Sequence, residues 1–238
     1  MSDQIQIEET ANELSTDSPA SVASEDQALG QLKDPELGSD QIEQISRQAG
    51  LMKSRKVRMA VACHQKTPRR VALRIIRELY TFELMQFALT PVAAADLRRL
   101  ADELLLSRLT SIALGERISL ARRSSTLVAG ALLLDKESSV WQPALENPRL
   151  TEVAIVRALQ RTNATAAFVE AVSHHSKWSV RSEVQVALLR NAHTPLAKAI
   201  EFARRIPAQA LRDILRVSRM PEKIKSYLKK EKALTADH

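Results

Sequence analysis

The chain has 238 residues, of which 45% are apolar but only 3% aromatic, and its formal net charge is +7. This length supplies enough apolar surface for one large folded domain or two small ones. Cys63 is the only cysteine, which excludes an internal disulfide framework and a metal site built from thiolates alone. The polar start of the chain does not resemble a secretory signal, and the longest apolar run, residues 127–134, is too short to span a bilayer. We therefore expect a cytoplasmic protein that does not enter membranes.

The charge is distributed very unevenly along the chain. Residues 1–50 hold eleven acidic residues against Lys33 and Arg47, a net charge of −9, whereas residues 51–238 carry +16. Residues 1–40 are rich in Ser, Asp, Glu and Gln and poor in large apolar residues. Such a segment buries too little surface to offset its ordering entropy. We therefore predict a disordered acidic tail over residues 1–40 and a folded domain over residues 41–238.

A short helix is expected directly after this tail, and helices are expected through the rest of the chain. Residues 39–50 read as a helix with Ser39 or Asp40 as its N-cap. Only two of the five glycines lie beyond residue 50, which favours continuous helical structure there.

Residues 57–79 align without a gap on residues 184–206, and the intermediate steps are also present. The repeat is marked by four threonines at intervals of 41 to 43 residues: Thr67, Thr110, Thr151 and Thr194. A threonine hydroxyl can accept a hydrogen bond from an amide in the next helical turn. Proline at Pro68 and Pro195 then suits the first helical position. The preceding helix is expected to end at His64 or at an asparagine such as Asn191, in the left-handed conformation that asparagine tolerates.

These signals predict an all-α protein built from antiparallel helix pairs that repeat about every forty-two residues. That period lies in the range of HEAT and armadillo repeats. A single pair cannot bury both faces, so neighbouring pairs must stack around a shared core. We therefore expect a right-handed α-solenoid, that is an α-α superhelix, of about four HEAT-like repeats with a disordered N-terminal tail.

Residues 117–152 and 176–206 resemble a widespread set of uncharacterised bacterial HEAT-like or leucine-rich-variant helical-repeat proteins. The family motif, roughly Val-x-x-Ala-Leu-x-Asn-x-x-Thr-Pro, is approximated by residues 184–195, "VQVALLRNAHTP". The resemblance implies a repeat fold and almost nothing about activity, because such repeats serve as scaffolds for many purposes. The iron–sulfur cluster that some leucine-rich-variant proteins carry is not expected, since this chain has one cysteine.

Candidate chemical residues are better explained as parts of the fold. Cys63 and His64 are adjacent, so on a helix they point in different directions and do not form a nucleophile–base pair. His174, His175 and His193 lack the i, i+4 spacing that aligns two metal ligands. Trp141 and Trp178 are expected to pack between repeats, although an exposed tryptophan would be a binding anchor. We therefore assign no catalytic, cofactor-binding or metal-binding residue.

Arginines are the strongest candidates for contact with a partner. Arg70, Arg74 and Arg77 follow an i, i+4, i+7 pattern and form one stripe on a helix. Arg204 aligns with Arg77 in the later copy of the repeat, and Arg205 follows it. A solvated helix face is the simplest interpretation, yet +16 over residues 51–238 exceeds what solubility requires. We predict that these five arginines contact an acidic partner.

The sequence therefore favours a non-enzymatic scaffold that binds protein partners through a basic surface. Nucleic-acid binding is the alternative, with a remote possibility of DNA-repair glycosylase activity, because HEAT-like alkylation-repair glycosylases have a similar size and architecture. Base-handling enzymes need aromatic side chains and a carboxylate at the pocket, and this chain has only eight aromatic residues. Phosphate-binding, nucleophile-elbow and zinc-protease motifs do not occur in the sequence.

Overall fold

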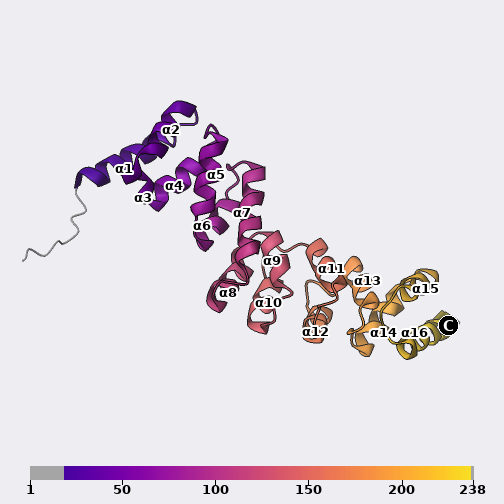
Figure 1. Ribbon diagram of the computed structural model, residues 1–238. Coiled ribbons are helices and arrows are strands. Elements are labelled where there is room, and N and C mark those ends of the chain that lie inside the picture. Colours follow the sequence, from indigo (N-terminus) through magenta and orange to yellow (C-terminus); the bar gives the residue numbers. More distant parts are fainter. Residues whose placement is uncertain (1–18, 237–238) are drawn as a thin grey trace, which may run out of the picture. The chain divides into compact units, whose positions relative to one another are not determined.

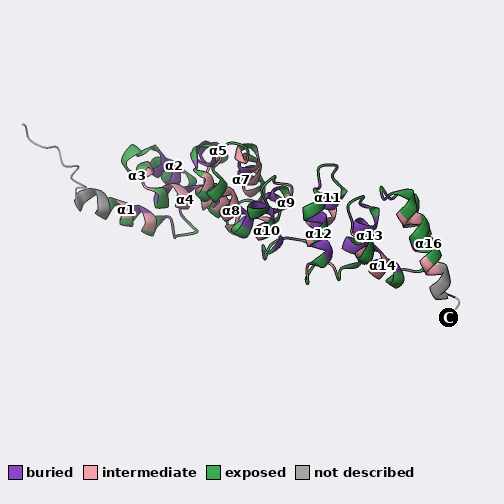
Figure 2. Ribbon diagram, turned by 90° about the horizontal axis from the view of Figure 1, so that it is seen from below, coloured by how far each residue is buried: buried purple, intermediate pink, exposed green. Residues whose placement is uncertain are grey.

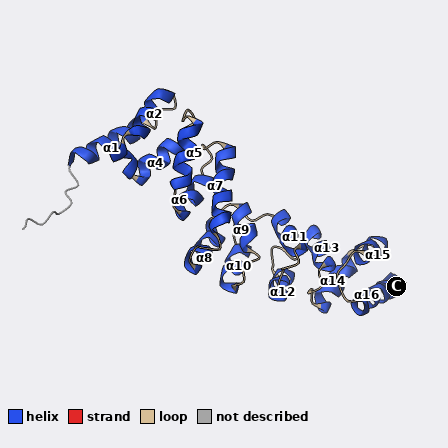
Figure 3. Ribbon diagram, viewed as in Figure 1, coloured by secondary structure: helices blue, strands red, loops and turns tan. Residues whose placement is uncertain are grey.

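The computed structural model describes residues 19–236, and over this range it is entirely helical. Sixteen helices and no strand occur among these residues (Figure 3). The chain divides into two compact units, residues 1–75 and residues 76–238, which we describe separately. Helix α5 crosses this division.

The first unit contains four helices and most of a fifth. These are α1 (Pro19–Gln31), α2 (Ser39–Arg47), α3 (Ala49–Lys53), α4 (Arg55–Cys63) and α5 (Arg69–Glu78). The expected helix after residue 39 is thus confirmed as α2. Its N-cap is Gly38, however, and the side chain of Gln41 accepts a hydrogen bond from the Gly38 N–H at 3.0 Å.

Residues 19–40 differ from the prediction of a disordered tail, whereas residues 1–18 lie outside the described residues. Helix α1 packs against α3 and α4 and ends in a turn that leads to α2. Ala28, Leu32 and Leu37 are buried, and the Ser54 hydroxyl donates to the Glu25 carboxylate at 2.7 Å. The composition of residues 19–40 alone indicates too little apolar surface for folding. These few apolar side chains are nevertheless buried, because α3 and α4 provide apolar faces against which they pack.

The second unit contains eleven further helices. They are α6 (Thr81–Ala88), α7 (Ala95–Arg108), α8 (Leu114–Arg123), α9 (Thr126–Leu132), α10 (Ser138–Leu145), α11 (Glu152–Gln160), α12 (Ala166–His174), α13 (Ser182–Arg190), α14 (Leu196–Arg205), α15 (Ala208–Arg216) and α16 (Glu222–Ala236). Purple, buried faces line the contacts between these helices in Figure 2. The largest fully buried side chains include Phe87, Phe168 and Phe202.

Helices of the second unit pack against the helix two positions further along the chain. α7, α9, α11, α13 and α15 contact one another in this order, and so do α6, α8, α10 and α12, while α14 contacts α16. Within this unit, Figure 1 shows the odd-numbered helices α9, α11, α13 and α15 on one side and the even-numbered helices on the other. The second unit is therefore two rows of helices, joined by short turns.

The stacking step in these rows is shorter than the repeat expected from the sequence. Thr67, Thr110, Thr151 and Thr194 precede α5, α8, α11 and α14, which is every third helix. Hydrogen bonds between successive helices of a row join residues about 29 positions apart, as in Ser218 to Leu189. The prediction of one helix pair per 42 residues is therefore wrong. Most of these helices have only seven to ten residues, so three of them fit into one sequence repeat.

The threonines at the helix starts play two different roles. Thr151 is an N-cap, as predicted, and its hydroxyl accepts from the Ala154 N–H at 3.4 Å. Thr67 and Thr194 instead donate to carbonyls of the preceding helix, those of Val61 and Leu188, at 2.6 Å each. Pro195 occupies the N-cap itself, one position earlier than expected. These two threonines therefore close the turn between helices and do not cap the next one.

Polar side chains in the turns tie each helix end to the preceding helix of the same row. Asn147 is fully buried, its amide nitrogen donates to the carbonyls of Ala121 at 2.8 Å and Ser124 at 3.3 Å, and its oxygen accepts from the Arg149 N–H at 2.8 Å. Asn191 makes the same contacts, with Leu159 at 2.7 Å and the His193 N–H at 2.9 Å. We call such contacts helix-end clamps. Because they satisfy carbonyls that a helix end leaves free, they fix the stacking step.

The clamps also explain the residue types at these positions. Asn191 has extended backbone, with φ −91° and ψ 138°, and no residue of the described chain, glycines included, has a positive φ. The expected left-handed asparagine is therefore wrong, because the side chain acts as a bridge. Ser218 clamps α15 to the Leu189 carbonyl at 2.7 Å. In the first unit, His64 replaces asparagine, with Nε2 at 3.0 Å from the Asp34 carbonyl and Nδ1 accepting from the Lys66 N–H at 3.2 Å.

Candidate binding surface

The five arginines predicted to bind a partner lie on two helices and are largely engaged within the protein. Arg70 binds the carboxylate of Glu43 with both oxygens at 2.6 Å, which ties α5 to α2. Arg74 donates to the Ser46 carbonyl at 3.2 Å. Arg77 is exposed, and its guanidinium has no hydrogen-bond partner among the described residues. The stripe on α5 therefore serves mainly to attach α5 to α2.

Arg204 and Arg205 on α14 are also paired. Arg204 contacts the Glu231 carboxylate of α16 at 2.8 Å, and Arg205 contacts Glu201 at 3.0 Å. The structure does not place these two arginines on the same helix as Arg70, Arg74 and Arg77. Alignment at an offset of 127 residues, about three of the 42-residue repeats, matched Arg204 with Arg77, but that repeat is not the stacking step.

The acidic partners of these arginines are correspondingly perturbed. Hydrogen bonds from Arg70 and then Arg47 lower the pKa of Glu43, and Glu43 in turn raises the pKa of Arg70. The hydrogen bond from Lys198 lowers the pKa of Glu201, with smaller contributions from the charges of Lys198 and Arg205. Both carboxylates are thus held ionised by cations of the same chain, which partly neutralises the predicted basic stripe.

A different set of arginines is exposed and unpaired. Arg161, Arg190 and Arg219 stand at intervals of 29 residues, which is the stacking step of the helices. They lie at or just after the ends of α11, α13 and α15. All three are exposed, and none of their guanidinium groups has a hydrogen-bond or ion-pair partner among the described residues. We call this set the arginine row.

Helix-end contacts bring the members of the arginine row next to one another. The Arg219 N–H donates to the Arg190 carbonyl at 2.9 Å. Asn191, directly after Arg190, binds the Leu159 carbonyl two residues before Arg161. Stacked helices lie about 8–10 Å apart, so the row presents regularly spaced positive charges. The row was not predictable from the 42-residue repeat, because its three arginines recur at intervals of 29 residues.

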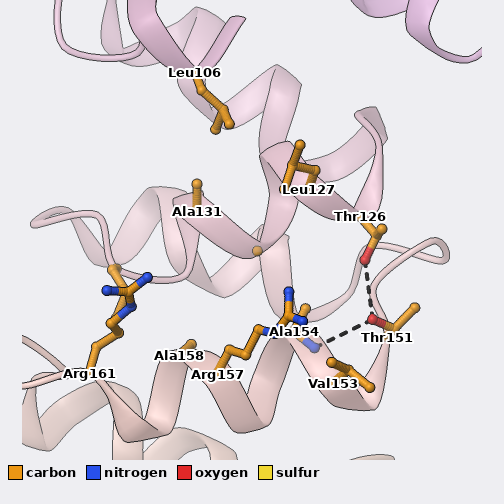
Figure 4. Close-up of a pocket in the computed structure, with 12 residues that line it drawn as sticks. Leu106, Thr126, Leu127, Ala131, Thr151, Val153, Ala154, Arg157, Ala158 and Arg161 are labelled. Carbon is orange, nitrogen blue, oxygen red and sulfur yellow. Dashed lines mark hydrogen bonds between the residues drawn. The ribbon is translucent and has the colours of Figure 1, made fainter. Parts of the chain in front are cut away.

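A pocket of about 290 Å³ opens beside the first member of the row. It lies between α7, α9 and α11, and its apolar lining includes Leu106, Leu127 and Ala131. Figure 4 shows Arg161 at one end of this pocket and the hydrogen-bonded Thr126 and Thr151 at the other. A glycine at Gly130 keeps α9 close to α11, since an added Cβ would lie 3.3 Å from the Cβ of Ala154.

The remaining candidate residues belong to the fold. Trp141 and Trp178 are buried, and the indole N–H of Trp178 donates to the Leu145 carbonyl at 3.0 Å, so the packing interpretation is confirmed. His175 contacts the Glu146 carboxylate at 3.0 Å through Nε2 and accepts from the Lys177 N–H through Nδ1. Both ring nitrogens of His64 are engaged in its clamp, which leaves neither available as a base for Cys63.

Other groups of ligand-forming side chains are not assembled in the described part of the chain. His174 contacts the Glu170 carbonyl at 3.0 Å on its own helix, and the described residues contain no cluster of three His, Cys, Asp or Glu side chains suited to a metal ion. No helix within residues 19–236 combines the length and apolar character needed to cross a bilayer. The side chains of this surface are thus suited to binding anions through arginines next to an apolar pocket.

Comparison with known proteins assigns no relative to this chain. No family model matches it, and neither a curated protein nor a solved structure matches it.

Proposed function

We propose that the protein is a non-enzymatic helical-repeat scaffold that binds an acidic protein partner through the arginine row. The observation that carries this proposal is the 29-residue interval of Arg161, Arg190 and Arg219, three exposed arginines without partners among the described residues. Several other arginines are paired with acids of the same chain, as Arg70 is with Glu43. Unpaired cations repeated at the step of the fold suit a ligand whose negative charges also repeat.

The scaffold itself is proposed to be a right-handed α-solenoid of HEAT-like helix pairs, similar to the bacterial repeat proteins named above. About four pairs would form its repeats, each with one helix from either row, as in α8 with α9 and α12 with α13. The two rows of helices and the equivalent clamps of Asn147 and Asn191 support this arrangement. Such stacks present long surfaces that act in binding more often than in catalysis.

Nucleic acid is the alternative partner, because evenly spaced arginines also suit a phosphate backbone. The two tryptophans are buried, and no aromatic residue lines the pocket beside Arg161, although Tyr80, Phe82 and Tyr227 are exposed elsewhere. The pocket and the tryptophans therefore offer no ring on which a base could stack. This favours a protein partner over a single strand and makes base-handling glycosylase chemistry the least supported function.

The proposal is tested with a fluorescent polyglutamate probe and a fluorescent random-sequence DNA duplex, by anisotropy over a range of salt concentrations. We expect polyglutamate to bind and its affinity to fall with salt. Reversal of the row, by Arg161→Glu, Arg190→Glu and Arg219→Glu together, should weaken binding by more than about tenfold.

The matched control reverses three exposed cations outside the row, by Arg122→Glu, Lys136→Glu and Arg181→Glu. It should keep most of the affinity, although both triple variants change the net charge equally. Equal losses in both variants would contradict a role for the row. Tighter binding of the duplex than of polyglutamate would favour the nucleic-acid alternative.

A further inference from the structure

The pocket between α7, α9 and α11 has the dimensions of a single large side chain. Its volume of about 290 Å³ lies just below the roughly 300 Å³ at which small-molecule pockets begin. Helix α7 contributes Leu106, α9 contributes Leu127 and Ala131, and α11 contributes Val153 (Figure 4). The exposed fraction is 43% for Leu127 and 59% for Val153, so the chain leaves this apolar surface in contact with solvent.

Positive charge flanks the pocket on one side only. Arg157 and Arg161 stand four residues apart, on α11 and at its end, and both line the pocket. Residues four apart share one face of a helix. Neither guanidinium has a partner among the described residues, and no acidic residue lines the pocket. The two threonine hydroxyls at the opposite end contact each other at 3.3 Å.

We infer that this pocket binds one bulky apolar side chain of an acidic peptide segment in a partner protein. The apolar side chain would occupy the space between α9 and α11. Acidic residues beside it would pair with Arg157 and Arg161, and further acids would continue along Arg190 and Arg219. Because Arg161 belongs both to the pocket and to the arginine row, the inference rests on the proposed function and adds the chemistry of the partner.

The experiment compares two labelled acidic peptides, one with a single central leucine and one with glycine in its place, by anisotropy with the full chain. Burying a leucine side chain contributes about 1.5–3 kcal/mol, which corresponds to at least about a tenfold difference in affinity. Ala131→Trp fills the pocket from an exposed position of α9 while leaving all arginines unchanged. It should remove the preference for leucine and leave binding of the glycine peptide unaltered.

Val153→Ser is the second variant, because Val153 is more than half exposed and its replacement does not disturb the core. It should reduce the leucine preference in part. Circular dichroism confirms that both variants fold. Reversal of Arg190 and Arg219 alone should weaken both peptides equally and keep the preference, since these arginines do not line the pocket.

Three results overturn the inference. If both peptides bind equally and with the same salt dependence, the pocket is not used, although the arginine row remains a binding surface. If removal of residues 1–18 raises the affinity for the leucine peptide, the occupant is the chain's own acidic segment and not a partner. Failure of both peptides to bind at low salt contradicts the proposed function as well.

Discussion

The same helix-end clamp occurs in both units of the molecule, but in very different surroundings. In the second unit Asn147 is fully buried and makes three hydrogen bonds, to Ala121, Ser124 and Arg149. In the first unit His64 makes only two, and its ring remains partly exposed. Local sequence thus specifies the turn in both places. The surrounding burial decides how much each turn contributes to stability, because an unsatisfied buried carbonyl has no water to replace its partner.

The largest loss of stability is expected when the buried clamp of Asn147 is removed. Asn147→Ala removes the partner of two carbonyls and one N–H in a site without solvent, and should lower the free energy of unfolding by about 3 kcal/mol. Chemical denaturation followed by circular dichroism measures this loss. Asn163→Ala, at an exposed turn position, is the matched control and should change stability by less than about 0.5 kcal/mol. Equal effects of the two substitutions would remove the distinction between buried and exposed clamps.

The next largest loss of stability is expected for a partly buried ion pair in the second unit. Arg117 of α8 contacts the Asp135 carboxylate, just after α9, at 2.7 Å, and the Asp135 side chain is only 7% exposed. Arg117→Met should cost about 2 kcal/mol, because it leaves a buried carboxylate without its cation. Arg122→Met on the same helix tests the loss of an exposed, unpaired arginine and should be nearly neutral. Thermal unfolding would contradict the prediction if both variants melted together.

A smaller change in stability is expected when Asp102 of α7 is replaced, and this replacement should stabilise the protein. Burial raises the pKa of Asp102, against the opposing hydrogen bond from the Ser125 hydroxyl at 2.8 Å. The folded state therefore holds this proton more tightly than the unfolded chain, so the contribution of Asp102 is fully present below its unfolded pKa. It is lost as the pH rises through the folded pKa.

Asp102→Asn keeps an acceptor for Ser125 and should thus stabilise the protein at neutral pH, by about 0.5 kcal/mol after solvent screening. The gain should disappear in acid, below the usual aspartate pKa of about 3.9. Denaturation midpoints measured over this pH range check the sign, with the exposed neighbour Glu103→Gln as control. A gain that grew toward low pH would be inconsistent with this explanation.

The smallest effect is expected at the exposed clamp. His64→Ala leaves the Asp34 carbonyl and the Lys66 N–H within reach of water, so the loss should remain below about 1 kcal/mol. His193→Ala is the comparison, since only the backbone N–H of His193 takes part in its clamp. A loss at His64 as large as that at Asn147 would mean that burial does not control the strength of these contacts.

Much of the helical character was predictable from the sequence, whereas the stacking was not. Apolar periodicity and sparse glycine indicated helices, and the Thr151 cap and the buried tryptophans were correctly interpreted. The stacking step was not predictable because the strongest sequence match, that of Thr67 with Thr194 at an offset of 127 residues, follows a different period. The repeated threonines precede only every third helix, whereas stacking joins every second helix. Which helices become neighbours depends on packing between elements, and the threonines report only where a turn lies.

Exposed positive charge was predictable from the sequence, but its location was not. The net charge indicated basic surface, but the five chosen arginines were selected by spacing within single helices. Whether an arginine is available depends on acids distant in sequence, such as Glu43 for Arg70 and Glu231 for Arg204. The pocket could not be anticipated, because Leu106, Leu127 and Val153 come from three separate helices.

The 29-residue interval of the arginine row places positive charges at regular distances along the surface. Because Arg161, Arg190 and Arg219 stand at or just after the ends of α11, α13 and α15, which stack about 8–10 Å apart, the three span roughly 20 Å along the second unit. A ligand of fixed length would be matched to the distance between these arginines. One additional helix pair would extend the row without altering the spacing of its charges. If the arginine row binds a partner as proposed, duplication of one helix pair would be sufficient to suit the row to a longer partner.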